Sequence, residues 1–84
     1  MNYSVDWVLD TRNSLAAIWL HSPNRNAVTK AQAKTDRLLS TDPITHGQPV
    51  SEGLYSIEVH LLRAIFELNE DARTIEIVGI SQLP

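Results

Sequence analysis

The chain has 84 residues and a formal net charge of -3, and its 43% hydrophobic and 20% charged residues are typical of a small globular domain rather than a disordered segment. It has no cysteine, which excludes a disulfide framework, a thiolate metal site and a cysteine nucleophile. No stretch approaches the ~18 apolar residues of a membrane span, and the first residues lack a basic head and a long apolar run. We therefore expect one soluble domain over residues 1–84, located in the cytoplasm.

The first predicted element is a strand over residues 2–9. Tyr3, Val5 and Trp7 alternate there with Ser4 and Asp6, which is the period of two that a half-buried strand requires. We expect the aromatic face of this strand to meet the core. The strand can then join the later strands as a fourth member of one sheet.

A helix is expected next, capped by Asp10, Thr11 or Asn13 and extending to about His21. Three large apolar residues recur on one of its faces, at the spacing i, i+3 and i+4: Leu15, Ile18 and Trp19. Ser22-Pro23 ends this helix, because proline disfavours helical geometry at the residue before it and has no N–H to donate. The same pair is expected to start the next helix.

The second helix is predicted over residues 23–40. The residues on its core side share helical spacing: Val28, Ala31, Thr35, Leu38 and Leu39. Asp42-Pro43 ends it, and the proline- and glycine-rich residues 41–53 are expected to form a loop that leads to the sheet.

Three consecutive strands are predicted over residues 54–60, 62–68 and 74–80, which are rich in alternating Ile, Val, Tyr and Phe. The polar residues 69–72 favour a tight turn between the last two. No turn residue marks the corner between the first two, so a helix remains an alternative there. Five residues would line one side of that helix: Ile57, Leu61, Leu62, Ile65 and Phe66.

The predicted fold class is α+β. The order is strand-helix-helix-strand-strand-strand, with two helices packed on one face of a small, mainly antiparallel sheet. Charge is divided between the two layers: residues 1–40 hold five basic and three acidic residues, whereas residues 41–84 hold two basic and seven acidic residues. Attraction to a polyanion is therefore expected from the helical half, unless these charges serve only solubility.

Candidate chemistry lies on the outer face of the predicted sheet. Alternation directs five polar residues away from the helices: Ser56, Glu58, His60, Arg63 and Glu67. Antiparallel pairing would bring Glu58 or His60 near Arg63, so that Glu or His could move a proton while Arg stabilises a phosphate. The alternative is a solvated face with one ordinary cross-strand ion pair. The three histidines lack metal-ligand spacing and no phosphate-binding loop is present, so we expect neither a metal nor a cofactor.

The order of the elements and several stretches resemble the RelE/ParE family of toxins from bacterial type II toxin-antitoxin systems. Residues 62–68, LRAIFEL, are similar to the arginine-bearing strand of the family, which is followed by an acidic turn and a hydrophobic strand ending near Val78-Gly79. Residues 36–43, DRLLSTDP, are similar to its helix-to-loop segment. The resemblance covers nearly the whole chain and implies a RelE/ParE-like domain.

The resemblance implies a toxin that a cognate antitoxin protein holds inactive. RelE-type members cut messenger RNA on the ribosome without a metal, and Arg63 matches their strand arginine. Ser56 and Glu58 stand where these enzymes commonly place lysines, and the arginine and tyrosine usual after the last strand are missing. Glu58 and His60 could imitate the glutamate and histidine of other members, so the expected catalytic residues are Arg63, Glu58 and His60.

Three functions stay open at this point. The first is inhibition of translation by ribosome-dependent mRNA cleavage. The second is a non-enzymatic role, either as a ParE-like inhibitor of DNA gyrase or as an attenuated toxin that only binds an antitoxin. The third is a domain that retains only the fold. The expected partner-binding residues are Ile65, Val78 and Ile80, which an antitoxin strand or helix, or a second copy in a homodimer, could cover.

Overall fold

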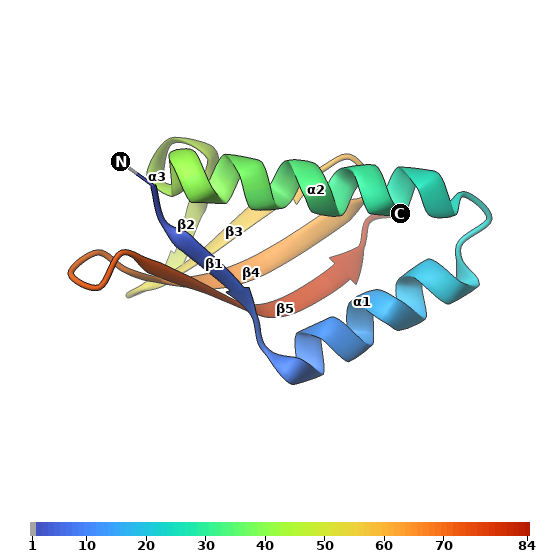
Figure 1. Cartoon of the computed structure of the whole chain (residues 1–84), viewed down its shortest axis with the longest axis horizontal. Helices are drawn as coiled ribbons and strands as arrows, with labels where there is room; N and C mark the ends of the chain where they lie inside the picture. The colour runs from blue at the N-terminus through green and yellow to red at the C-terminus, as the bar shows by residue number, and fades with distance from the viewer. Residues whose placement is uncertain (1) are drawn as a thin grey trace.

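The structure, a computed structural model that describes residues 2–84, packs two long helices on one face of a five-stranded sheet (Figure 1). A third, short helix lies at the end of the second. The elements in chain order are β1 Ser4–Trp7, α1 Leu9–His21, α2 Arg25–Thr41, α3 Pro43–His46, β2 Gln48–Ser51, β3 Leu54–Val59, β4 Leu62–Asn69 and β5 Thr74–Gln82. Among the described residues, no helix has the length and apolar character needed to cross a membrane.

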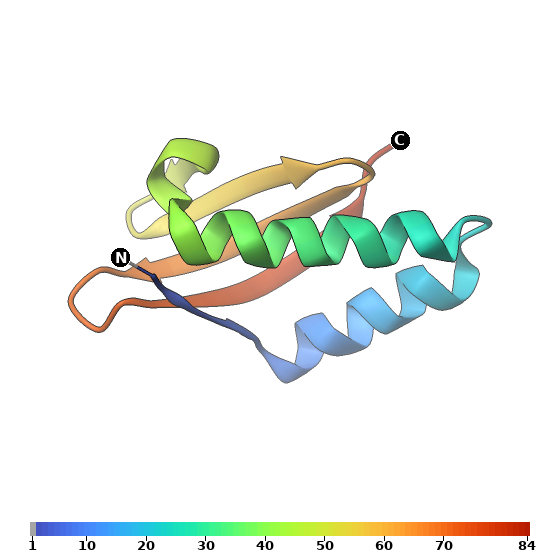
Figure 2. The ribbon, with the colours of Figure 1, turned by 45° about the horizontal axis from the view of Figure 1, so that its top comes forward.

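The strand order β1-β5-β4-β3-β2 places the N-terminal strand beside the C-terminal one. β1 is parallel to β5 in the register Ser4↔Thr74 to Trp7↔Ile77, and the other neighbouring strands are antiparallel. Figure 2 shows α2 lying along the sheet, whereas α1 lies beside β5 at an angle to α2. The predicted α+β class and the mainly antiparallel sheet are confirmed.

The core lies between α2 and the inner face of the sheet. Side chains that alternate along β3, β4 and β5 bury Ile57, Phe66 and Ile77, and the predicted face of α2 buries Val28 and Leu39 against them. Phe66 is fully buried, and its ring stacks on Tyr55 with 5.6 Å between ring centroids. Burial of these apolar faces is the main contribution to stability that a chain of this size can have.

The predicted caps of the first helix are wrong. α1 begins at Leu9, after Val8, whose side chain forms no capping hydrogen bond. The boundary is set by tertiary pairing instead, because the Val8 N–H donates to the carbonyl of Ile77 while the Val8 carbonyl accepts from Arg12. Thr11 consequently faces the core, where it is 2% exposed.

The break at Ser22-Pro23 is confirmed, but α2 begins two residues later than predicted. Its cap is Asn24, whose side chain accepts a hydrogen bond from the Ala27 N–H at 3.1 Å. At the other end Asp42 both terminates α2 and caps α3, since its carboxylate accepts from the Thr45 N–H at 3.2 Å.

The prediction of a loop over residues 41–53 is wrong, because this segment holds α3 and the edge strand β2. β2 pairs with β3 in the register Gln48↔Ser56 and Pro49↔Tyr55. Its side chains are all exposed, so no alternation marks it as a strand, and an edge position tolerates its proline. The sheet therefore has five strands rather than four.

Gly47, between α3 and β2, lies against the core. A Cβ at this position would stand 2.7 Å from Cζ of Phe66 and 2.8 Å from the carbonyl oxygen of Pro43. Both atoms belong to packed, inflexible surroundings, so only glycine fits. This close approach holds the end of α3 against Phe66 of β4.

The corner between β3 and β4 is a two-residue turn at His60 and Leu61, which excludes the helical alternative for this region. His60 adopts a left-handed conformation with φ of 54°. A residue with a Cβ is strained there, typically by about 1 kcal/mol, whereas glycine is not.

We therefore expect His60→Gly to raise the free energy of unfolding by roughly 0.5–1 kcal/mol. Urea denaturation of the purified protein measures this change. His60→Ala is the matched control, because it removes the imidazole but keeps the Cβ and should give no such gain. A glycine variant no more stable than the alanine variant would refute the strain at this turn.

Thr11 carries a buried hydroxyl without a hydrogen-bond partner among the described residues. Such a group loses its hydration on folding and gains nothing in exchange, so the near-isosteric Thr11→Val should stabilise the fold by about 1 kcal/mol. Thr35→Val provides the comparison, because the equally buried Thr35 hydroxyl donates to the Ala31 carbonyl at 2.7 Å. Thermal or urea unfolding should show a gain at position 11 and a loss at position 35; equal effects would argue against this account.

Candidate functional site

The outer face of the sheet places Glu58 of β3 directly opposite Arg63 of β4. Both side chains are exposed, as alternation predicted, and within residues 2–84 neither takes part in an ion pair. A carboxylate and a guanidinium therefore stand side by side and remain free to meet a ligand. Of the two residues that the sequence placed near Arg63, Glu58 or His60, the structure pairs Glu58 with it. The catalytic roles of these residues stay predictions.

A pocket of about 260 Å³ lies at this pair. Its lining residues come from α3, β2, β3 and β4: His46, Gln48, Ser56, Ile57, Glu58 and Arg63. The pocket forms because β2 starts only at Gln48, opposite Ser56, so that the edge of β3 beyond Ser56 lacks a strand partner on that side. His46, at the end of α3, reaches this open edge.

His60 occupies a different position from the one expected. The β3–β4 ladder ends at the Val59–Leu62 pair, so His60 lies in the turn beyond it and does not line the pocket. The histidine that does line it, His46, was missed by the sequence interpretation. The position of His46 can be predicted only if β2 is already known. Extending the antiparallel Gln48↔Ser56 register by two residues then brings position 46 beside position 58.

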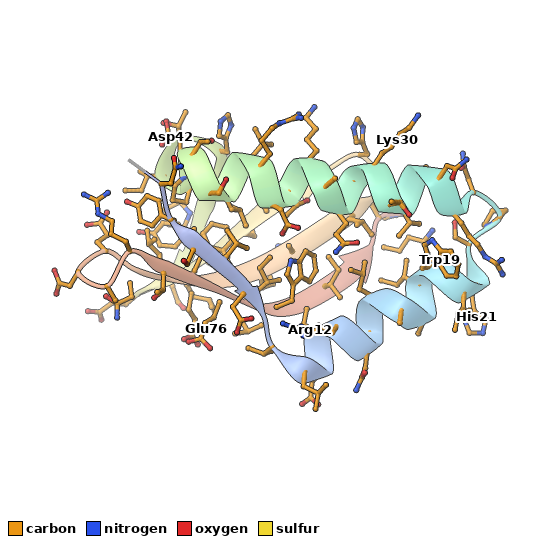
Figure 3. The ribbon with its side chains drawn as sticks, viewed as in Figure 1. Arg12, Trp19, His21, Lys30, Asp42 and Glu76 are labelled. Carbon is orange, nitrogen blue, oxygen red and sulfur yellow. The ribbon has the colours of Figure 1, made fainter. Side chains whose placement is uncertain are left out.

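Charged groups near His46 come from the start of its own helix, at Asp42, and from the strands, at Glu58 and Arg63. The pKa of Asp42 is lowered, first by hydrogen bonds from Thr45 and to a smaller extent by the nearby charge of His46. The carboxylate of Asp42 is therefore ionised across the range in which an imidazole titrates. Figure 3 shows Asp42 where α2 meets α3.

The far end of the outer face is acidic. Five carboxylate side chains border an open depression there: Glu52, Glu67, Glu70, Asp71 and Glu76. Glu67 and Glu76 are direct cross-strand neighbours, an arrangement of like charges that is destabilising. Arg63 is the one basic residue within the β3, β4 and β5 sequences, so phosphate attraction on this face is confined to its end of the sheet.

The helical layer has a second, more apolar groove of about 530 Å³ between α1 and α2, bordered by Trp7, Trp19 and Val28 among others. Trp19 (Figure 3) is 39% exposed there. The Arg25 guanidinium lies 4.8 Å from its ring centroid. Beside the groove the indole N–H of Trp7 donates to Asp36 at 2.7 Å. Burial raises the pKa of Asp36, and the hydrogen bond from Trp7 partly offsets this.

The three predicted partner-binding residues differ in their exposure and in the face of the sheet on which they lie. β5 has a register shift opposite Ile65 and Phe66, which leaves Val78 as an extra residue. Val78 is 38% exposed and Ile65 is half-buried on the outer face, but Ile80 pairs with Ala64 and packs partly buried against the core. Their role in partner binding remains a prediction.

The comparison with solved structures gives matches over nearly the full length of the chain. A RelBE toxin-antitoxin complex from Mycobacterium tuberculosis matches with a TM-score of 0.76 and 19% identity, covering 98% of this chain and 99% of that one. A ParDE system from P. aeruginosa matches with a TM-score of 0.72 and 17% identity, covering 98% and 97%. An archaeal RelE-RelB complex from Pyrococcus horikoshii gives 0.70 and 16%, covering 98% and 96%.

No family model and no curated protein sequence matches the chain. The structural matches agree in the arrangement of helices and sheet, and at these identities they establish the fold alone. The chain thus has the fold of the RelE/ParE toxins, as the sequence resemblance implied.

Proposed function

We propose that this protein is the toxin of a type II toxin-antitoxin system in the cytoplasm and that it inhibits translation by cutting messenger RNA on the ribosome. The observation that carries the proposal is the direct cross-strand pair of Glu58 and Arg63 in a small polar pocket. A base beside a permanently charged guanidinium is the minimum that phosphodiester cleavage needs.

The proposed reaction uses side chains alone. The Glu58 carboxylate removes the proton of the ribose 2′ hydroxyl, and the 2′ oxygen attacks the adjacent phosphorus. Arg63 binds the non-bridging oxygens and stabilises the negative charge that develops on them. The bond to the 5′ oxygen breaks and this oxygen takes up a proton from an acid at the site, which yields a 2′,3′-cyclic phosphate and a 5′ hydroxyl end.

Recruitment by the ribosome fits the charge of the chain. An outer face with one arginine, the neighbouring Glu58 and five further carboxylates cannot bind free RNA tightly, because phosphate contacts dominate such affinity. Productive encounter therefore requires a partner that holds the RNA in place. We expect the purified protein to cut mRNA bound to programmed ribosomes much faster than the same RNA free in solution.

The proposed inhibitory partner is a cognate antitoxin. Support comes from the structural neighbours, which are toxin-antitoxin assemblies, and from exposed apolar side chains such as Val78, Trp19 and Leu20. Coexpression with the neighbouring reading frame followed by size-exclusion mass measurement tests this. A homodimer that excludes the neighbour's product would contradict it.

Expression of the protein without its genomic neighbour tests the proposal in cells. We expect growth arrest and broken transcripts with wild type, and neither with Arg63→Ala. Normal growth with intact mRNA would refute the toxin activity.

The second candidate function is non-enzymatic inhibition of DNA gyrase. The acidic outer face favours it, because it weakens any RNA-binding role, and one of the matching structures is a ParDE system. Growth arrest with a DNA-damage response and intact transcripts would support this function and exclude RNA cleavage.

A further inference from the structure

His46 brings a third functional group to the pocket of Glu58 and Arg63. It is the last residue of α3 and lies on the β2 side of β3, whereas Arg63 lies on the β4 side. A carboxylate, a guanidinium and an imidazole from three different elements thus border one polar space of about 260 Å³.

The position of His46 is fixed by backbone contacts rather than by its own side chain. The His46 N–H points to the Asp42 carbonyl at 3.4 Å, and the next residue, Gly47, donates to the Pro43 carbonyl at 2.8 Å. Gly47 also packs so closely on the buried ring of Phe66 that a Cβ has no room. An exposed side chain that starts from a rigid backbone is suited to precise chemistry.

We infer that His46 is a catalytic residue of this pocket and that it protonates the leaving 5′ oxygen. The inference rests on the proposed RNA cleavage. As Glu58 takes the proton of the 2′ hydroxyl, the His46 imidazolium gives its proton to the 5′ oxygen while the P–O5′ bond breaks. Glu58 ends protonated and His46 neutral, and exchange with water restores both.

His46 and His60 differ in their access to the pocket, and a general acid needs such access. The charged groups facing His46 are Asp42 of its own helix, Glu58 of β3 and Arg63 of β4. His60 lies in the turn beyond the last paired residues and borders no part of the pocket. A general acid must reach the substrate within hydrogen-bond distance, so geometry favours His46.

The first experiment measures single-turnover cleavage of mRNA on programmed ribosomes as a function of pH. We expect His46→Gln to lower the rate by about 10²–10⁴-fold and to remove the alkaline limb of the profile, since an imidazolium no longer supplies the proton. His21→Gln is the control and should behave as wild type, because His21 lies at the opposite end of the molecule from Asp42 (Figure 3). Loss of the alkaline limb in His60→Gln instead of His46→Gln would overturn the inference.

A second readout avoids dependence on turnover. In NMR titrations with a 2′-deoxy dinucleoside phosphate, which cannot be cut, at concentrations high enough to saturate a weak site, the ring resonances of His46 should shift saturably in wild type and not in Arg63→Ala. Resonances that stay unchanged in wild type would overturn the inference. Cleavage that needs Arg63 but survives His46→Gln would refute the role of His46 alone, whereas absence of any cleavage by wild type would refute the proposed function as well.

Discussion

Arg63→Ala is expected to lower the rate of mRNA cleavage by about 10²–10³-fold, the usual loss when one group that stabilises a developing oxyanion is removed. The guanidinium is the only cation that β3, β4 and β5 present on the outer face, so no neighbouring strand residue can replace it. Because Arg63 is exposed and makes no ion pair within the described residues, stability should change by no more than about 0.5 kcal/mol.

The matched control is Arg37→Ala, which removes the same charge from the exposed side of α2. It should leave cleavage unchanged. Arg63→Lys tests geometry, because an ammonium keeps the charge but lacks the fork that binds two phosphate oxygens, and we expect an intermediate rate. Equal rates for Arg63→Ala and Arg37→Ala, measured by primer extension on cleaved transcripts, would remove Arg63 from the mechanism.

Phe66→Ala is expected to have the largest effect on stability, about 3–5 kcal/mol. Phe66 is fully buried in the core, stacks on Tyr55 and packs directly against Gly47. Removal of its ring leaves a cavity under the residue that positions His46. A domain of 84 residues has only about 4–12 kcal/mol of total stability, so this substitution should remove a large part of it.

Phe66→Leu provides the comparison, because it keeps most of the volume and should cost only about 1–1.5 kcal/mol. Urea denaturation followed by circular dichroism measures both variants. Comparable costs for alanine and leucine would mean that the core collapses around position 66, and the account of Gly47 as a rigid support would then fail.

The three C-terminal strands could be predicted from sequence because their side chains alternate between core and solvent. The same alternation predicted Glu58 or His60 near Arg63, and the two-residue turn in the structure fixes the register that selects Glu58. Helix α2 was recognisable for a related reason, because one of its faces is buried and Thr35 lies among aliphatic residues on it.

The missed features leave no periodic signal in the sequence. β2 exposes every side chain and contains Pro49, so its strand conformation comes from pairing with β3. The start of α1 depends on a hydrogen bond from Val8 to Ile77, which is 69 positions away. The extra residue Val78 in β5 reverses the expected alternation, and this turns Ile80 toward the core.

The pocket itself depends on these missed features. Glu58 and Arg63 follow from alternation, but His46 and Gln48 enter only because a short helix and an edge strand fold where a loop was expected. Sequence therefore predicts the base and the cation of the site and not its imidazole.

The central claim is that the Glu58–Arg63 pocket cuts RNA, and the chemical nature of the products tests it most directly. Purified protein should be incubated with programmed ribosomes, and the mRNA fragments analysed for their ends. We predict 2′,3′-cyclic phosphate and 5′ hydroxyl termini with wild type and intact mRNA with Arg63→Ala. Intact mRNA with wild type, or identical fragments from both proteins, would contradict it.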